Sequence, residues 1–132
     1  MTLLRRVIAW QAVLWGIAGL ALALAPGTLV EGLLDQTPAI ESSWLRALGV
    51  AAIVLAAQMV LVGRKLEELW WWSWSFVILE AATAIVFVLN AAFGVPEGAA
   101  SWPWWLIGVV NGGLAGLEIA ALAKAGMERP PV

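Results

Sequence analysis

The sequence predicts an all-α membrane protein that crosses the bilayer four times. Of its 132 residues, 63% are apolar and only 12% are charged, whereas soluble proteins average about half and about a quarter. The charges form short clusters, and the apolar stretches between them are long enough to cross ~30 Å of hydrocarbon as helices. Lipid offers backbone groups no hydrogen-bond partner, and these stretches lack the alternation typical of barrel strands. The sequence therefore favours helices.

The four spans are predicted at residues 7–25, 44–63, 69–93 and 102–123 of one transmembrane domain, residues 1–132. Pro26 ends the first of them, and Thr28 and Glu31 have the spacing of a capping box. The segment PGTLVEGLLDQ thus predicts a short amphipathic turn that lies in the membrane interface. The connection GRKLEE is so short that the second and third helices are expected to be antiparallel neighbours.

Basic residues predict the orientation of the chain. Only Arg46 falls on one side of the predicted spans, and the other side carries Arg5, Arg6, Arg64, Lys65, Lys124 and Arg129. Because Lys and Arg are enriched in cytoplasmic loops, both termini are expected to be cytoplasmic. We therefore expect a multi-pass protein of the cell membrane, and the high Ala and Gly content favours a bacterial plasma membrane.

The residue types that are missing exclude several functions. The chain has no Cys and no His, which removes disulfides, thiol chemistry, most transition-metal sites and the usual haem ligands. We expect no metal site, no cofactor and no redox catalysis. A net charge of -2, with no basic run longer than two residues, makes nucleic acid an improbable partner.

Ten tryptophans mark the two membrane boundaries. Indole rings favour that level because the ring is apolar and its N–H binds water or a headgroup. The boundary positions are Trp70, Trp71 and Trp72 on the basic side and Trp44, Trp102, Trp104 and Trp105 on the other. Trp15 and Trp74 lie deeper, so we expect them to pack inside the bundle or to line a cavity.

Glu80 interrupts the apolar run of the third span, LEELWWWSWSFVILEAATAIVF. Counted from Trp70, it lies ~15 Å into the membrane. A central acidic residue costs about 2.5 to 3.5 kcal/mol on insertion scales, so Glu80 should face the interior of the bundle. There it either meets hydrogen-bond donors or takes up a proton.

The fourth span predicts a polar surface that faces Glu80. Asn111 and Glu118 fall on one stripe of that helix, with small residues between them. Gln11 and Gln58 are expected near the membrane level of Glu118. The candidate ligand-binding residues are Glu80, Asn111, Glu118, Trp74, Trp15, Gln11 and Gln58.

Glycines on the fourth span predict a close helix contact. Gly108, Gly112 and Gly116 have the small-xxx-small spacing that lets two helices approach without intervening side chains. This stripe favours a homodimer or another membrane protein as partner, in addition to membrane lipid.

Two segments carry a resemblance to a known family. They are GIAGLALALAPGTLVEGLL, in which a Gly-rich helix ends at Pro26 before a short turn, and WLRALGVAAIVLAAQMVLVGRK, which opens with Arg46 and Gly49. In this order of features the first half of the chain resembles the small DoxX-like bacterial membrane proteins. The resemblance implies an integral bundle of four helices and assigns no catalytic residue. The small multidrug transporters are similar in size, but they carry a carboxylate in the first helix, where this chain has Gln11.

Two functions compete on these observations. The first is a non-enzymatic membrane protein whose polar core binds a small lipophilic or cationic ligand, or a proton, through carboxyl groups and cation–π attraction. The alternative is a structural or accessory subunit of a larger membrane complex, in which the buried acids only form hydrogen bonds. A lipid or sterol-type isomerase is disfavoured because no basic partner for a carboxyl acid is visible.

Overall fold

The computed structural model describes residues 1–39 and 41–128, and every regular element in these residues is helical. The long helices are α1 (Thr2–Leu24), α2 (Ser42–Arg64), α4 (Ser73–Phe93) and α5 (Trp102–Glu128). Between them lie a π-helical turn, η1 (Thr28–Leu33), a single helical turn, α3 (Leu66–Leu69), and a 3-10 turn, η2 (Trp70–Trp72). The predicted all-α class is confirmed.

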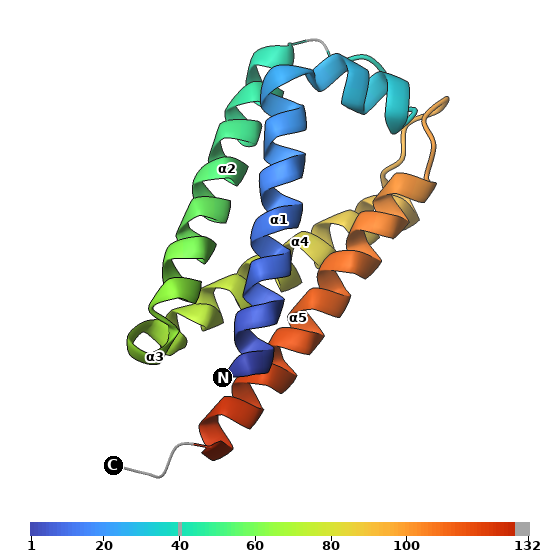
Figure 1. Ribbon diagram of the computed structural model, residues 1–132. Helices are drawn as coiled ribbons and strands as arrows, with labels where there is room; N and C mark the ends of the chain where they lie inside the picture. The colour runs from blue at the N-terminus through green and yellow to red at the C-terminus, as the bar shows by residue number, and fades with distance from the viewer. Residues whose placement is uncertain (40, 129–132) are drawn as a thin grey trace.

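Four helical stretches are long and apolar enough to cross a membrane: Thr2–Leu24, Ser42–Arg64, Leu66–Phe93 and Trp102–Glu128. The chain is thus a multi-pass membrane protein. Each of the four stretches begins earlier or ends later than its predicted span, because the helices continue into charged turns that need no lipid. At one end of the molecule the amino group of Met1 lies 2.9 Å from Glu128 Oε2, so the start of α1 and the end of α5 lie side by side (Figure 1).

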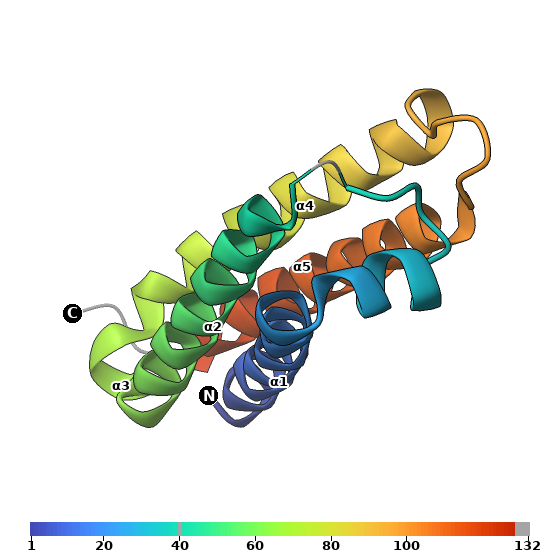
Figure 2. The same cartoon turned by 90° about the horizontal axis from the view of Figure 1, so that it is seen from above.

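The helices form two pairs, α1 with α2 and α4 with α5 (Figures 1 and 2). The pairs meet mainly where α1 touches α5. The expectation that the second and third long helices pack along each other is wrong, because α4 packs along α5 and not along α2. The turns α3 and η2 separate α2 from α4 and redirect the chain.

Glycines explain why α1 pairs with α2. A Cβ placed on Gly49 would lie 2.6 Å from the carbonyl oxygen of Gly19, and one placed on Gly19 would lie 2.8 Å from the carbonyl oxygen of Gly49. Both distances are shorter than real Cβ contacts, so only glycine permits the two backbones to cross this closely. Gly108 also lets α5 approach α4 closely, since its Cβ would lie 2.8 Å from Val88 Cγ2 and 3.3 Å from the backbone nitrogen of Val88.

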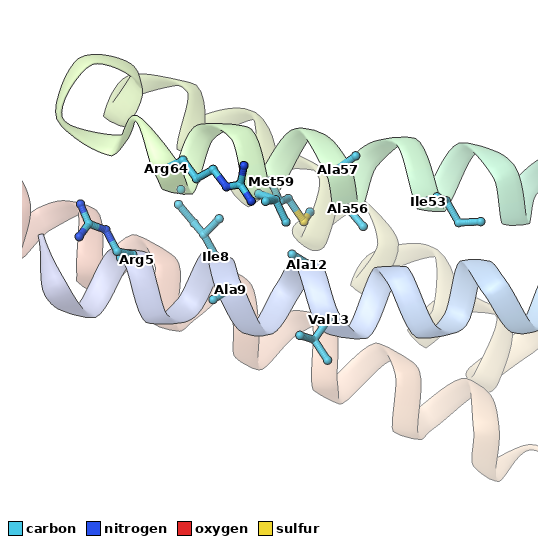
Figure 3. Close-up of a pocket in the computed structure, with 12 residues that line it drawn as sticks. Arg5, Ile8, Ala9, Ala12, Val13, Ile53, Ala56, Ala57, Met59 and Arg64 are labelled. Atoms are coloured by element: carbon cyan, nitrogen blue, oxygen red, sulfur yellow. The ribbon is translucent and has the colours of Figure 1, made fainter.

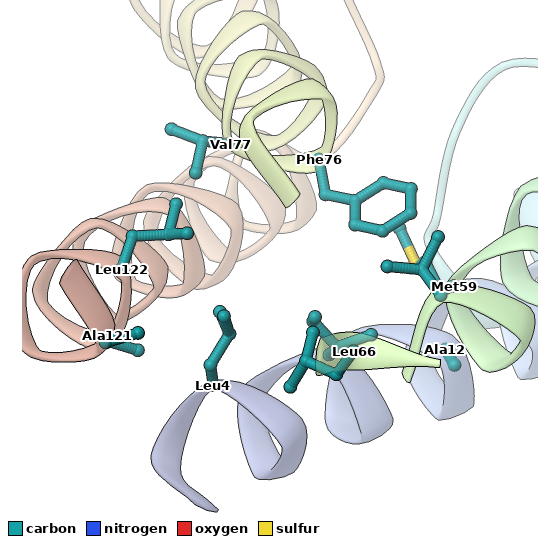
Figure 4. Close-up of a cluster of buried hydrophobic side chains, with 11 residues drawn as sticks. Leu4, Ala12, Met59, Leu66, Phe76, Val77, Ala121 and Leu122 are labelled. Atoms are coloured by element: carbon teal, nitrogen blue, oxygen red, sulfur yellow. The ribbon is translucent and has the colours of Figure 1, made fainter. Parts of the chain in front are cut away.

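The apolar core lies at the end of the molecule where the helix pairs converge. Its cluster draws side chains from all four long helices and from α3, as Figure 4 shows for Leu4, Met59, Leu66, Phe76 and Leu122. Leu4, Met59 and Leu66 are fully buried. This core fixes α1 against both α4 and α5, and so determines which polar side chains of the three helices face one another.

The segment after α1 crosses to the loop between α4 and α5 (Figure 2). Its π-helical turn has no buried residue, and Leu33 is 66% exposed, as expected for a turn that rests in a membrane interface. The predicted capping box is wrong: no side chain caps η1. Gln36 instead anchors the segment. Its Nε2 donates to the carbonyls of Leu34 (2.7 Å) and Ala100 (2.9 Å), and its Oε1 accepts from Trp104 Nε1 (2.9 Å).

Replacing Gln36 with leucine should lower the free energy of unfolding by about 1 to 3 kcal/mol, because Trp104 Nε1 and the Ala100 carbonyl would lose a partly buried partner. Unfolding followed by tryptophan fluorescence in detergent measures this loss. Thr37→Val, at the exposed neighbouring residue, is the control and should change stability little. An equal loss in both variants would contradict the anchoring role of Gln36.

Candidate functional site

Two carboxyl groups are buried where the helix pairs meet. Glu80 of α4 and Glu118 of α5 are both fully inaccessible to solvent. Each receives one hydrogen bond from α1: Trp15 Nε1 donates to Glu80 Oε1 at 2.8 Å, and Gln11 Nε2 donates to Glu118 Oε2 at 2.7 Å. Gln11 and Trp15 are four residues apart, so one face of α1 reaches both acids. The prediction that both acids turn inward is confirmed.

The two acids form a polar cluster with Gln11 and Trp15, and three oxygen atoms of this cluster lack a hydrogen-bond partner, as does the buried hydroxyl of Ser73 elsewhere on α4. Gln11 Oε1, Ser73 Oγ, Glu80 Oε2 and Glu118 Oε1 are buried and accept or donate no hydrogen bond. An ionised carboxylate and an amide oxygen can only accept hydrogen bonds, so only the hydroxyl of Ser73 brings a hydrogen of its own. The cluster is therefore rich in acceptors and poor in donors.

The same cluster has no basic side chain to balance its charge. In the part of the chain that the structure describes, every Lys and Arg side chain is exposed. The donors that bind Glu118 and Glu80 lie one turn apart on α1, so the two carboxyls approach neighbouring turns of the same helix. Two ionised carboxylates in an apolar interior would be costly without a counter-ion. The arrangement can thus take up positive charge or hydrogen-bond donors.

In the described residues, the other predicted site residues form no hydrogen bond with Glu80 or Glu118. Asn111 is buried, but its Nδ2 donates to the carbonyl of Ile107 on its own helix at 2.8 Å. Gln58 is exposed on α2, where its neighbour Met59 takes the buried position. Trp74 is 48% exposed, so its expected place inside the bundle is wrong. Ser73 and Phe76 occupy the nearest buried positions of α4 on either side of it.

The sequence did not predict which helix donates hydrogen bonds to the two acids. The donors to both acids come from α1, whereas the sequence indicated a partner surface on the fourth span. The spacing of Gln11 and Trp15 by one helical turn is the signal that points to a shared face. Ser73, seven residues before Glu80, lies on the same face of α4 and is fully buried.

Two open grooves lie elsewhere on the molecule. The larger, about 700 Å³, runs between α1 and α2, and the smaller, about 390 Å³, lies between α4 and α5 beside Gly108 and Gly112. Neither is lined by Glu80 or Glu118. Of the predicted glycine stripe, Gly108 is buried against α4 of the same chain, and a Cβ on Gly116 would meet nothing within 4 Å.

No known protein family, curated protein or solved structure matches the chain. The fold and the site together define a class, a multi-pass membrane protein with a buried pair of carboxyl groups.

Proposed function

We propose that Glu80 and Glu118 form a buried site that binds and releases protons. The observation that carries this proposal is that each of the two buried carboxyl groups has one oxygen atom without a partner, as does the amide of Gln11 beside Glu118. A proton on a carboxyl turns an acceptor into a donor and removes a charge in the same step. Proton binding thus supplies both things that the cluster lacks.

The size of the site favours a proton over a larger ligand. Both carboxyls are fully covered by protein, and each already holds a neutral donor within hydrogen-bond distance. Intramembrane acidic residues that face the interior of a bundle are typical of proton relays. A small lipophilic or cationic ligand would need α1 to move away from α4 and α5, which would break both bonds.

Infrared difference spectroscopy tests this function directly. The carbonyl stretch of a protonated carboxyl should appear and disappear reversibly as the pH of the reconstituted protein is cycled. Glu80→Gln and Glu118→Gln should each remove part of the band of the buried acids, and the double variant should leave only the bands of the exposed acids. Glu97→Gln, in the exposed loop between α4 and α5, is the matched control and should leave the band of the buried acids unchanged.

A carboxyl band that is undiminished in the double variant would refute the proposal. So would an unchanged cellular phenotype together with an unchanged band in both single variants. That second result would favour the alternative, an accessory subunit of a larger membrane complex whose acids only form hydrogen bonds. A supporting observation for the alternative is that Gly116 lies open on the outer side of α5, where another membrane helix could approach closely.

A further inference from the structure

The larger groove, between α1 and α2, is lined by both charged and apolar side chains. It is lined on α1 by Arg5, Ile8, Ala9, Ala12 and Val13, and on α2 by residues from Ile53 to Arg64. Figure 3 shows Arg5 and Arg64 at the same end of the groove, one on each helix. The rest of the lining in that view is apolar. The groove thus has one cationic end and one long apolar part.

Small residues open the groove between the two helices. Ala12 and Ala56 are buried along its floor together with Ile8 and Met59, and Val60 on one wall is 44% exposed. The helices close again beyond it, because Gly19 and Gly49 bring the two backbones into contact. The groove therefore narrows in the direction away from the arginines.

The length of the groove matches one leaflet of a bilayer. From Arg5 to Val13 the lining covers about 12 Å of α1, and from Ile53 to Arg64 it covers about 16 Å of α2. Half of the ~30 Å hydrocarbon core is about 15 Å. An acyl chain that begins at the headgroup level beside the arginines would thus end near the point where the helices cross.

The charges at the open end complement an anionic headgroup. Arg5 and Arg64 are exposed, and among residues 1–39 and 41–128 neither has an ion-pair partner. A guanidinium group binds phosphate oxygens through two parallel hydrogen bonds. Both arginines also lie on the side with most of the Lys and Arg residues, the side that is expected to face the leaflet rich in anionic lipids.

We propose that the groove between α1 and α2 is a binding site for one anionic phospholipid. The phosphate lies between Arg5 and Arg64, and one acyl chain lies along Ala9, Ala12 and Ala57. This site is separate from the carboxyl pair, because neither Glu80 nor Glu118 lines the groove. The occupant is a membrane lipid and not free phosphate, since the apolar lining would gain nothing from an inorganic ion.

Native mass spectrometry of the full-length protein tests the site. Protein purified in detergent is titrated with phosphatidylglycerol, with phosphatidylcholine of the same acyl chains, or with inorganic phosphate, and retained ligand is counted. We expect phosphatidylglycerol to be retained far better than the other two. Replacing both arginines (Arg5→Gln and Arg64→Gln) should weaken its retention about 25-fold, since each arginine at a membrane surface contributes about fivefold. The control replaces Arg6 and Lys124, two exposed cations at the same end, and should reduce retention far less.

A second variant tests the apolar part of the site independently. Ala57→Leu should fill the groove and lower the retention of phosphatidylglycerol, whereas Ala120→Leu on the exposed side of α5 should not. The proposal fails if phosphatidylcholine or inorganic phosphate is retained equally well. It also fails if the control cation variant weakens binding as much as the arginine variant, or if Ala57→Leu has no effect, because binding would then reflect surface charge alone.

Discussion

Replacing Gly49 with leucine is expected to separate α1 from α2 and to cost more than about 3 kcal/mol of stability. Overpacking usually costs about 1 to 3 kcal/mol where a side chain can move aside. At Gly49 the atoms in the way belong to the backbone: the new Cβ would lie 2.6 Å from the carbonyl oxygen of Gly19 and 2.9 Å from the carbonyl carbon of Leu22. Backbone atoms of a helix cannot yield without moving the whole helix.

The smaller change Gly49→Ala tests whether the contact with α1 causes the loss of stability. Alanine stabilises an isolated helix by about 1 kcal/mol relative to glycine, so a loss of stability must come from the contact with α1. Gly113→Ala is the matched control, because a Cβ there meets nothing within 4 Å, and it should be neutral or slightly stabilising. Unfolding by sodium dodecyl sulfate titration, followed by circular dichroism, gives both values. Equal stability of the two alanine variants would show that the crossing at Gly49 does not limit the fold.

The sequence predicted the number of membrane helices and the inward direction of both acids for the same physical reason. Charged and polar groups are costly in hydrocarbon, so apolar length defines the spans and the acids must turn away from lipid. Glu80 and Glu118 follow this rule, since both are fully buried. Trp74 and Gln58 do not contradict it, because an indole or an amide can stand at the perimeter at lower cost.

The order of the helices around the molecule could not be predicted in that way. In lipid, all faces of a span are apolar, so periodicity does not identify the neighbour of each helix. The sequence shows the stripe of glycines on the fourth span, and Gly108 does pack closely, but the backbones approach more closely at Gly49, where α2 meets Gly19 and Ala23 of α1. That contact depends on the register of α1 on α2. The packing of α1 also explains why its Gln11 and Trp15 donate the hydrogen bonds to both acids.

Removing both hydrogen-bond donors of α1 tests how much the bonds to Glu80 and Glu118 stabilise the contact between the two helix pairs. The double variant Gln11→Leu and Trp15→Phe removes the hydrogen bonds to Glu118 and Glu80 and keeps most of the apolar bulk. In the described residues, these are the side-chain hydrogen bonds that join α1 to α4 and α5. Interhelical hydrogen bonds in membranes contribute up to ~1.7 kcal/mol each, so we expect a loss of about 2 to 3 kcal/mol.

Matched controls make the same chemical changes at the perimeter. Gln58 and Trp74 are both exposed, so Gln58→Leu and Trp74→Phe together should change the free energy of unfolding little. The size of the loss also reports on the proposed proton site. Neutral, protonated acids lose only hydrogen bonds, whereas an ionised carboxylate left without a buried partner costs about 3 to 5 kcal/mol for each group. A loss well above 3 kcal/mol would thus argue that the acids are held as carboxylates. No loss would mean that apolar packing alone joins the helix pairs.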